Sequence, residues 1–322
     1  MSFSFSDFSA ALKAGAPITA DDVLALRRWV WPDGVVSNSE AEALFALDRE
    51  VTDAAPEWDD FFVEAISEHV LNASEPHLYV DEPTAEWLIG QFAQDGAPVK
   101  PVELETVVTI LERALNAPAS LKSWALRQIE TAVLTGEGPT RRDGPLQPGR
   151  VDVAEVKLLR RLVFAAGGDG ALIVGDEEAE MLWRIKDATL HADNPPEWMQ
   201  LFVQALGNHL MAWTNYHPLE RAQAAQLETF MNDRHSSVLG FLGRMAGQLA
   251  HPDFKDAEQI ALHGVLGHEP TAAEHDASVA AADDVTPAEQ SWLQGHVDAD
   301  GARDPYEEAL LAFIAAEKRR AA

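Results

Sequence analysis

The chain repeats part of itself, and this internal duplication restricts its possible folds more than any other feature of the sequence. Three blocks of the first half recur in the same order in the second half: 18–31 matches 151–164, 39–45 matches 177–183, and 57–72 matches 197–212. A fourth block, 80–112, matches 285–317 with a constant offset of 205 and no gap. Because four ordered matches hardly arise by chance, the sequence predicts two diverged copies of one module.

The spacing of the matched blocks locates an insertion in the second copy. The offset grows from 133 to 138 to 140 and then jumps to 205. This jump predicts an insertion of roughly 65 residues, between about 213 and 284. The segment between the copies, 136–150, is rich in glycine, proline and charge, which is typical of an exposed linker. We therefore expect a first module at 1–135 and a second at 151–322.

Apolar residues recur at helical spacing in both copies, which predicts an all-α fold. Residues 57–72 and 102–115 place apolar side chains three and four positions apart, and the alternation typical of strands is absent over any useful length. Three segments carry the capping-box pattern of a helix start, namely Thr19–Asp22, Ser37–Glu40 and Thr286–Glu289. Each copy should contain about five helices joined by short turns.

Acidic residues outnumber basic ones, which excludes several classes of partner. The 322 residues include 53 Asp and Glu against 24 Lys and Arg, for a formal net charge of −29. Such a surface repels nucleic acid and anionic membranes, whereas a divalent cation or a basic protein is attracted to it. The same acidity also serves solubility alone.

Cysteine usage and the absence of targeting segments set the expected compartment. The chain has no cysteine, which excludes disulfides, thiolate metal sites and cysteine nucleophiles. Its first residues lack the basic start and apolar run of a secretory signal, and no segment has the apolar length of a membrane span. The expectation is a cytoplasmic protein that binds a protein partner.

An Asp-Gly turn followed by a carboxylate at the start of the next helix occurs four times. The turns are Asp33-Gly34, Asp95-Gly96, Asp169-Gly170 and Asp300-Gly301. Two helices that flank such a turn are similar to an EF-hand, whose calcium loop needs oxygen ligands at positions 1, 3 and 5, glycine at 6 and a bidentate glutamate at 12.

The loop at 296–307 fits the calcium pattern best. It offers Asp298, Asp300, Asp304 and Glu307 at positions 3, 5, 9 and 12, and His296 at position 1 is unsuited to calcium. The other three loops keep only part of the ligand set. A tight turn followed by a glutamate that caps the second helix explains the same residues without a metal, and this alternative stays open for 296–307. The cofactor that the pattern predicts is Ca²⁺ or another divalent cation.

The segment 33–44, DGVVSNSEAEAL, resembles the turns of the TerB-like helical domains of tellurite resistance. Those are all-α modules with acidic turn-plus-Glu segments, linked to metal binding and stress complexes. The resemblance covers about a tenth of the chain and leaves its Trp-rich helices unexplained. It implies Asp33, Glu40 and Glu42 as candidate metal ligands, and it implies no reaction.

Other recurring side chains have both structural and functional interpretations. Trp58 and Trp198 stand among apolar neighbours and are expected to anchor the core. His69 and His209 recur at one helical position and are expected to bond to backbone rather than to bind a ligand. The basic pairs Arg27-Arg28 and Arg160-Arg161 are expected to pair with carboxylates of the chain, with an acidic partner as the alternative.

Three hypotheses about function follow from these features. The first is a non-enzymatic helical adaptor or sensor that binds a protein partner, with a divalent cation as an optional part. The second is a purely structural interaction module that binds no metal. The third is a metal-dependent enzyme with a site in the insertion, where four histidines lie at spacings that do not match HExxH: His251, His263, His268 and His275.

Overall fold

The computed structural model describes most of the two expected modules. The described residues are 5–31, 34–72, 75–94, 96–141, 148–165, 174–211, 287–297 and 303–321. They belong to one compact unit, made of 1–218 and 285–322. The expected insertion at about 213–284, with its histidines, lies outside the described residues.

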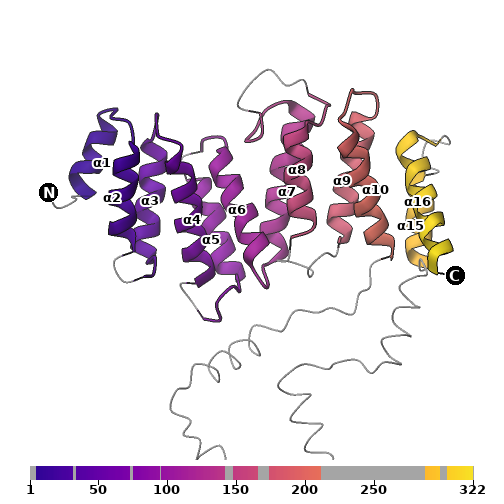
Figure 1. The fold of residues 1–322 in the computed structure, drawn as a ribbon, viewed down its shortest axis with the longest axis horizontal. Coiled ribbons are helices and arrows are strands. Elements are labelled where there is room, and N and C mark those ends of the chain that lie inside the picture. Colours follow the sequence, from indigo (N-terminus) through magenta and orange to yellow (C-terminus); the bar gives the residue numbers. More distant parts are fainter. Residues whose placement is uncertain are drawn as a thin grey trace, which may run out of the picture. The chain divides into compact units, whose positions relative to one another are not determined.

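Within these residues the chain forms twelve helices and no strands, which confirms the predicted all-α class (Figure 1). The first half contains α1 (Phe5–Lys13), α2 (Ala20–Val30), α3 (Asn38–Glu50), α4 (Glu57–Asn72), α5 (Glu82–Phe92), α6 (Pro101–Arg113) and α7 (Ala119–Thr135). The second half contains α8 (Val153–Val163), α9 (Asp176–Thr189), α10 (Pro196–Met211), α15 (Pro287–Val297) and α16 (Pro305–Ala321). None of the described helices is long and apolar enough to cross a bilayer.

Helix limits coincide with the capping signals of the sequence. The hydroxyl of Thr19 accepts a hydrogen bond from the backbone N–H of Asp22 at 3.2 Å, and the Asp22 carboxylate accepts one from the N–H of Thr19 at 2.9 Å. Ser37 and Glu40 form the same capping box at the start of α3. Each box satisfies backbone N–H groups that have no partner inside the helix, so it fixes where the helix begins.

The even-numbered helices pack against one another in chain order. α2 contacts α4, α4 contacts α6, α6 contacts α8, α8 contacts α10, and α10 contacts α16. Of the odd-numbered helices, α1 contacts α3, α5 contacts α7, and α7 contacts α9. Glu68 and Arg113 meet at 3.4 Å near the ends of α4 and α6, so these two helices run in the same direction. A row of parallel helices requires a returning helix between successive members, and the odd-numbered helices supply it.

One continuous cluster of buried apolar side chains extends through both halves. Trp58 and Trp198 are among its largest members, at 1% and 0% exposure, which confirms them as core anchors. Because α6 and α7 both contact α8, the connection at 136–150 does not interrupt the core. The expected exposure of this connection does not hold for Arg141, whose side chain is only 1% exposed.

The starts of α6 and α16 revise the sequence alignment of the fourth block. Both helices begin at a proline, Pro101 and Pro305, which are 204 residues apart. Each start also has a glutamate at its third position, Glu103 or Glu307, that accepts from the N–H of the residue before the proline. An ungapped offset of 205 would place the two helix starts out of register by one residue, so that offset does not hold along the whole block.

Candidate functional site

The acidic turn before α3 is held by hydrogen bonds within the protein. Asp33 lies outside the described residues. The Glu40 carboxylate accepts from the backbone N–H of Ser37 at 2.8 Å and from its hydroxyl at 2.7 Å. Glu42 is exposed on α3. Glu40 therefore caps a helix, and the capping explanation of this turn accounts for its position.

Two histidines at matching positions of α4 and α10 anchor the loops before α3 and α9. Nδ1 of His69 lies 2.8 Å from the carbonyl oxygen of Val36, and Nδ1 of His209 lies 3.0 Å from that of Val174. Each ring packs on a tryptophan, with ring centroids 5.3 Å apart for His69–Trp87 and 5.2 Å apart for His209–Trp292. Burial lowers the pKa of His69, which favours a neutral ring that donates from Nδ1. Both histidines bond to backbone, as the sequence predicts.

Two of the candidate calcium ligands at 296–307, Asp304 and Glu307, contact a buried lysine. Asp298 and Asp300 lie outside the described residues. Asp304 and Glu307 form the capping box of α16, in which the N–H of Glu307 donates to Asp304 at 3.0 Å. Nζ of Lys186, a residue of α9 that is 1% exposed, lies 2.6 Å from Oδ2 of Asp304 and 2.9 Å from Oε1 of Glu307. The ammonium thus supplies the positive charge at this end of the loop.

Electrostatics strengthen this lysine cluster. Burial lowers the pKa of Lys186, but hydrogen bonds to Asp187, Asp304 and Glu307 outweigh burial and raise the pKa above its ordinary value. Burial raises the pKa of Asp304, but hydrogen bonds from Lys186 and from backbone N–H groups outweigh it, and the pKa falls below its ordinary value. Both groups are therefore charged at neutral pH.

A second ion pair lies at the start of α6, and here α3 carries the acid and the residue before α6 carries the base, the reverse of Lys186 and Asp304. Oδ2 of Asp48, on α3, is 2.7 Å from Nζ of Lys100, the residue before α6. The offset of 138 between the second pair of matched blocks places Lys186 opposite Asp48, and the helix starts place Asp304 opposite Lys100. The alignment thus matches the acid of each pair to the base of the other.

This exchange changes the partner of a core tryptophan. In the first half, Nε1 of Trp58 donates to Oδ1 of Asp48 at 3.2 Å. In the second half, the position matched to Asp48 holds Lys186, which offers no acceptor, and Nε1 of Trp198 is buried without a hydrogen-bond partner among the described residues. A buried donor without an acceptor costs free energy, so the two halves differ in stability at this point.

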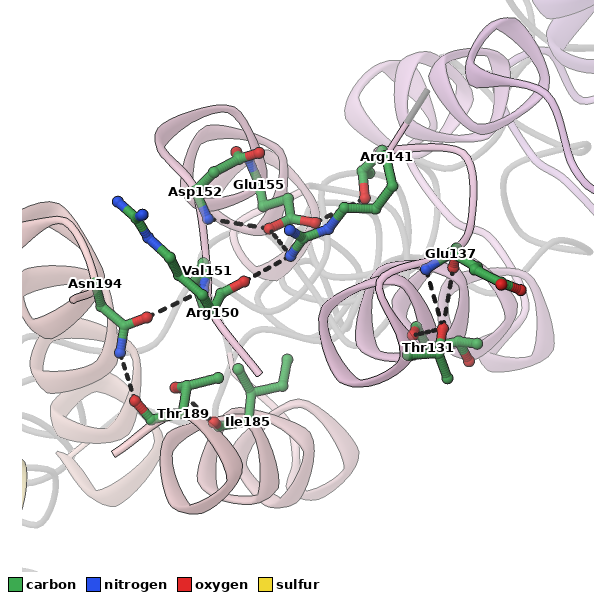
Figure 2. A network of polar contacts seen from close by, with 12 residues as sticks. Thr131, Glu137, Arg141, Arg150, Val151, Asp152, Glu155, Ile185, Thr189 and Asn194 are labelled. Atoms are coloured by element: carbon green, nitrogen blue, oxygen red, sulfur yellow. Dashed lines mark hydrogen bonds and ion pairs between the residues drawn. The ribbon is translucent and has the colours of Figure 1, made fainter. Parts of the chain in front are cut away.

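A buried polar network ties the connection between the halves to α8 (Figure 2). Nη2 of Arg141 lies 2.7 Å from the Glu155 carboxylate and 2.6 Å from the carbonyl oxygen of Arg150. The hydroxyl of Thr140 donates to the same carboxylate at 2.8 Å. Burial raises the pKa of Glu155, and its hydrogen bonds and the charge of Arg141 oppose that rise. Nearby, Asn194 accepts from the N–H of Val151 at 3.0 Å.

The recurring arginines pair with carboxylates of the chain. Nη2 of Arg27 lies 2.5 Å from Oε2 of Glu64. Nη2 of Arg161 lies 2.7 Å from Glu105 and 2.8 Å from Glu112, so it links α8 to α6. These contacts confirm the predicted pairing for Arg27 and Arg161.

A polar depression lies between α7 and α9. Its sides contain an ion pair between Arg184 and Glu130 at 2.6 Å and a hydrogen bond between Ser123 and Glu177. Beside it, Lys122 and Glu178 form a buried ion pair. The carboxylates named here each have a protein partner, so the depression is a set of salt bridges that joins two helices.

An apolar groove of about 520 Å³ lies between α10 and α16. Its lining includes Pro196, Met199, Gln200 and Val203 from α10, and Tyr306, Ala309 and Phe313 from α16. The groove contrasts with the charged clusters, because its lining offers apolar contact and few polar groups. No sequence pattern indicates this groove, since its two sides come from segments that lie far apart in the chain.

In the stretches that the structure describes, no group of three or more His, Asp or Glu side chains is placed to hold a metal ion. Comparison with protein-family models, curated proteins and solved structures finds no match. No sequence signal singled out Lys186, because its alignment with Asp48 is a mismatch. No sequence signal singled out the pairing of Arg141 with Glu155.

Proposed function

We propose that the chain is a non-enzymatic adaptor in which two diverged copies of one stacked-helix module present different outer surfaces to a protein partner. One contrast carries this proposal. The contacts inside the module recur at aligned positions, whereas the residues on its outer face do not.

The recurring contacts involve several helices at once. His69 and His209 each hold the loop before the preceding helix, and each packs on an aligned tryptophan. The ion pair between Asp48 and Lys100 has a counterpart with exchanged charges, formed by Lys186 and Asp304. Each contact joins residues from two different matched blocks, so its recurrence supports two copies of one module.

The outer faces of α4 and α10 differ in chemistry. Asp59, Asp60 and Glu64 of α4 align with Met199, Gln200 and Gln204 of α10. Stacked helical modules contact only their neighbours, and they bind partners through the faces that remain open. Solubility alone would favour charge on both faces. The loss of three carboxylates from one face fits a surface that has a partner.

The cation expected at 296–307 is a separable part of this function. A calcium ion that used Asp304 and Glu307 would have to displace the buried ammonium of Lys186. Titration calorimetry with CaCl₂ on the intact chain and on Asp300→Ala tests it. Absence of heat in the intact chain removes the cation from the function, and heat that the substitution abolishes makes the cation part of it.

Affinity capture tests the adaptor function. The full chain is immobilised and exposed to extract of the source cells, with and without chelator, beside an unrelated helical protein of similar negative charge. We expect a small set of proteins that the chain retains and the control does not, to the same extent with chelator. Retention no different from that of the charge-matched control would overturn the proposed function.

A further inference from the structure

The groove between α10 and α16 has a shape that can accommodate a third helix. Asn194, just before α10, lies 3.4 Å from the hydroxyl of Tyr306 at the start of α16, so the two helices begin side by side. Further along, a side chain at Gly207 would clash with the ring of Phe313. The two helices therefore run in the same direction, and the groove follows them.

The absence of a side chain at Gly207 shapes one end of the groove. The ring of Phe313 lies against the backbone of α10 there, where any Cβ would displace it. Phe313 is half-buried and lines the groove together with Val203, which lies one turn before Gly207. An aromatic wall held in this way offers a fixed apolar surface to a partner.

The apolar character is specific to this pair of helices. At the aligned places in the first half, α4 and α6 carry Glu64 and Glu105, which pair with Arg27 and Arg161. In the second half, these places hold Gln204 and Ala309. The carboxylates of the first surface thus correspond to neutral residues in the second, where Arg160, which aligns with Arg27, donates to Gln204 at 2.8 Å. This comparison rests on the duplicated modules of the proposed function.

The lining residues form one row along each helix, and a third helix can lie in the groove between two such rows. Pro196, Met199 and Val203 follow one another at intervals of three and four residues, as do Tyr306, Ala309 and Phe313. A helix that enters such a groove presents its own apolar residues at i, i+3, i+4 and i+7 between these rows.

The charge of the chain indicates what flanks the apolar face of that helix. Asp193, Glu197 and Glu308 are exposed and stand next in sequence to lining residues. The chain as a whole carries a formal charge of −29. Basic residues beside an apolar face are attracted by this field, which raises the association rate, whereas a second copy of the chain is repelled.

We propose that the groove between α10 and α16 binds an amphipathic helix of a partner protein, with basic residues on both sides of its apolar face. Met199, Val203 and Phe313 contact the apolar face, and the surrounding carboxylates attract the basic residues. The proposal names a site and a partner chemistry for the adaptor function, on which it rests.

Fluorescence anisotropy with three labelled peptides tests the proposal on the full chain. The probes are an amphipathic Leu/Lys peptide of about 16 residues, which spans roughly 24 Å as a helix, a Leu/Glu peptide of the same pattern and a scrambled Leu/Lys peptide. We expect the amphipathic Leu/Lys peptide to bind at least about tenfold more tightly than either control. Equal binding of the scrambled peptide would show attraction by charge alone and would overturn the proposal, as would absence of binding.

Two substitutions locate the binding. Val203→Glu places a charge in the groove, and Gln200→Arg repels a basic peptide from an exposed position that leaves the fold intact. Each substitution should lower the affinity for the Leu/Lys peptide by about tenfold or more. The control Leu24→Glu, at a residue of α2 that is 52% exposed, should leave this affinity unchanged. Unchanged binding to Gln200→Arg would place the site elsewhere and overturn the proposal.

Two further measurements separate this proposal from its alternatives. Sedimentation that shows a dimer of the intact chain, dispersed by Val203→Glu, would identify a second copy as the occupant and overturn the proposal. If Gln200→Arg still captures the cellular partners at wild-type level, the groove is not their binding site and the proposal is overturned, whereas the adaptor function is unaffected. Loss of those partners on this substitution supports both.

Discussion

Removal of the Lys186 ammonium tests the electrostatic reasoning most directly. Lys186→Met keeps a long apolar side chain but leaves the carboxylates of Asp304 and Glu307, 10% and 4% exposed, without their cation. Breaking a buried ion pair by removing one partner costs about 3–5 kcal/mol. With a urea m-value of about 3 kcal/mol/M, the unfolding midpoint should fall by about 1 to 2 M.

The stability that Lys186→Met loses should depend on pH, and the direction of this dependence can be predicted. In the wild type, the pKa of Asp304 is lowered by folding, so its contribution to stability is present above the unfolded pKa and is lost as the pH falls through the folded value. In Lys186→Met, two carboxylates share a buried site without a cation, which raises their folded pKa and reverses the sign. The variant should therefore lose less stability, relative to wild type, at about pH 5 than at about pH 8.

Urea unfolding followed by circular dichroism measures both effects. The matched control is Lys157→Met, because Lys157 is an exposed lysine of α8 and its loss should cost less than about 0.5 kcal/mol. If the free energy of unfolding of Lys186→Met lies within about 1 kcal/mol of the wild-type value at neutral pH, the reasoning is refuted, since the carboxylates then do not depend on the ammonium. If the variant loses the same stability at both pH values, the predicted pH dependence is refuted.

Two other pairs of variants test neighbouring contacts by the same unfolding assay. Trp58→Phe should cost about 0.5–1.5 kcal/mol more than Trp198→Phe, because only Trp58 donates to Asp48; equal costs would contradict the charge exchange. Arg141→Met should cost about 3–5 kcal/mol by stranding the buried Glu155 carboxylate, and addition of Glu155→Gln should recover most of that loss. No recovery in the double variant would mean that Arg141 stabilises the connection through other contacts.

Local signals in the sequence predicted the helices well, because the physics that sets their limits is local. The capping boxes at Thr19 and Ser37 begin α2 and α3 where the pattern places them. The predicted helix at 57–72 matches α4 in both bounds. In each case the determining atoms lie within one or two turns of chain, so the printed order of residues contains the required information.

The acidic turns show why the metal hypothesis could not be decided from sequence. Positions 9 and 12 of a calcium loop have the same spacing as the N-cap and third residue of a capping box. Asp304 and Glu307 occupy both patterns at once, and so do Ser37 and Glu40. Only the position of Lys186, which is 118 residues before Asp304, shows what neutralises the carboxylates. Long-range contacts of this kind lie beyond any local pattern.

The exchanged ion pair shows where an alignment by identity fails. Asp48 and Lys186 count as a mismatch, as do Lys100 and Asp304, yet the two pairs have the same Coulomb attraction. The fold constrains the pair and not either residue. The hydrogen bond from Trp58 to Asp48 has no such symmetry, because an indole N–H can donate to a carboxylate but not to an ammonium. Among the described residues Trp198 has no acceptor for its indole N–H, while Lys186 pairs with Glu307 as well as with Asp304. At either place, reversing the charge of one residue alone would leave two like charges in a buried site, so the two positions of each pair constrain each other.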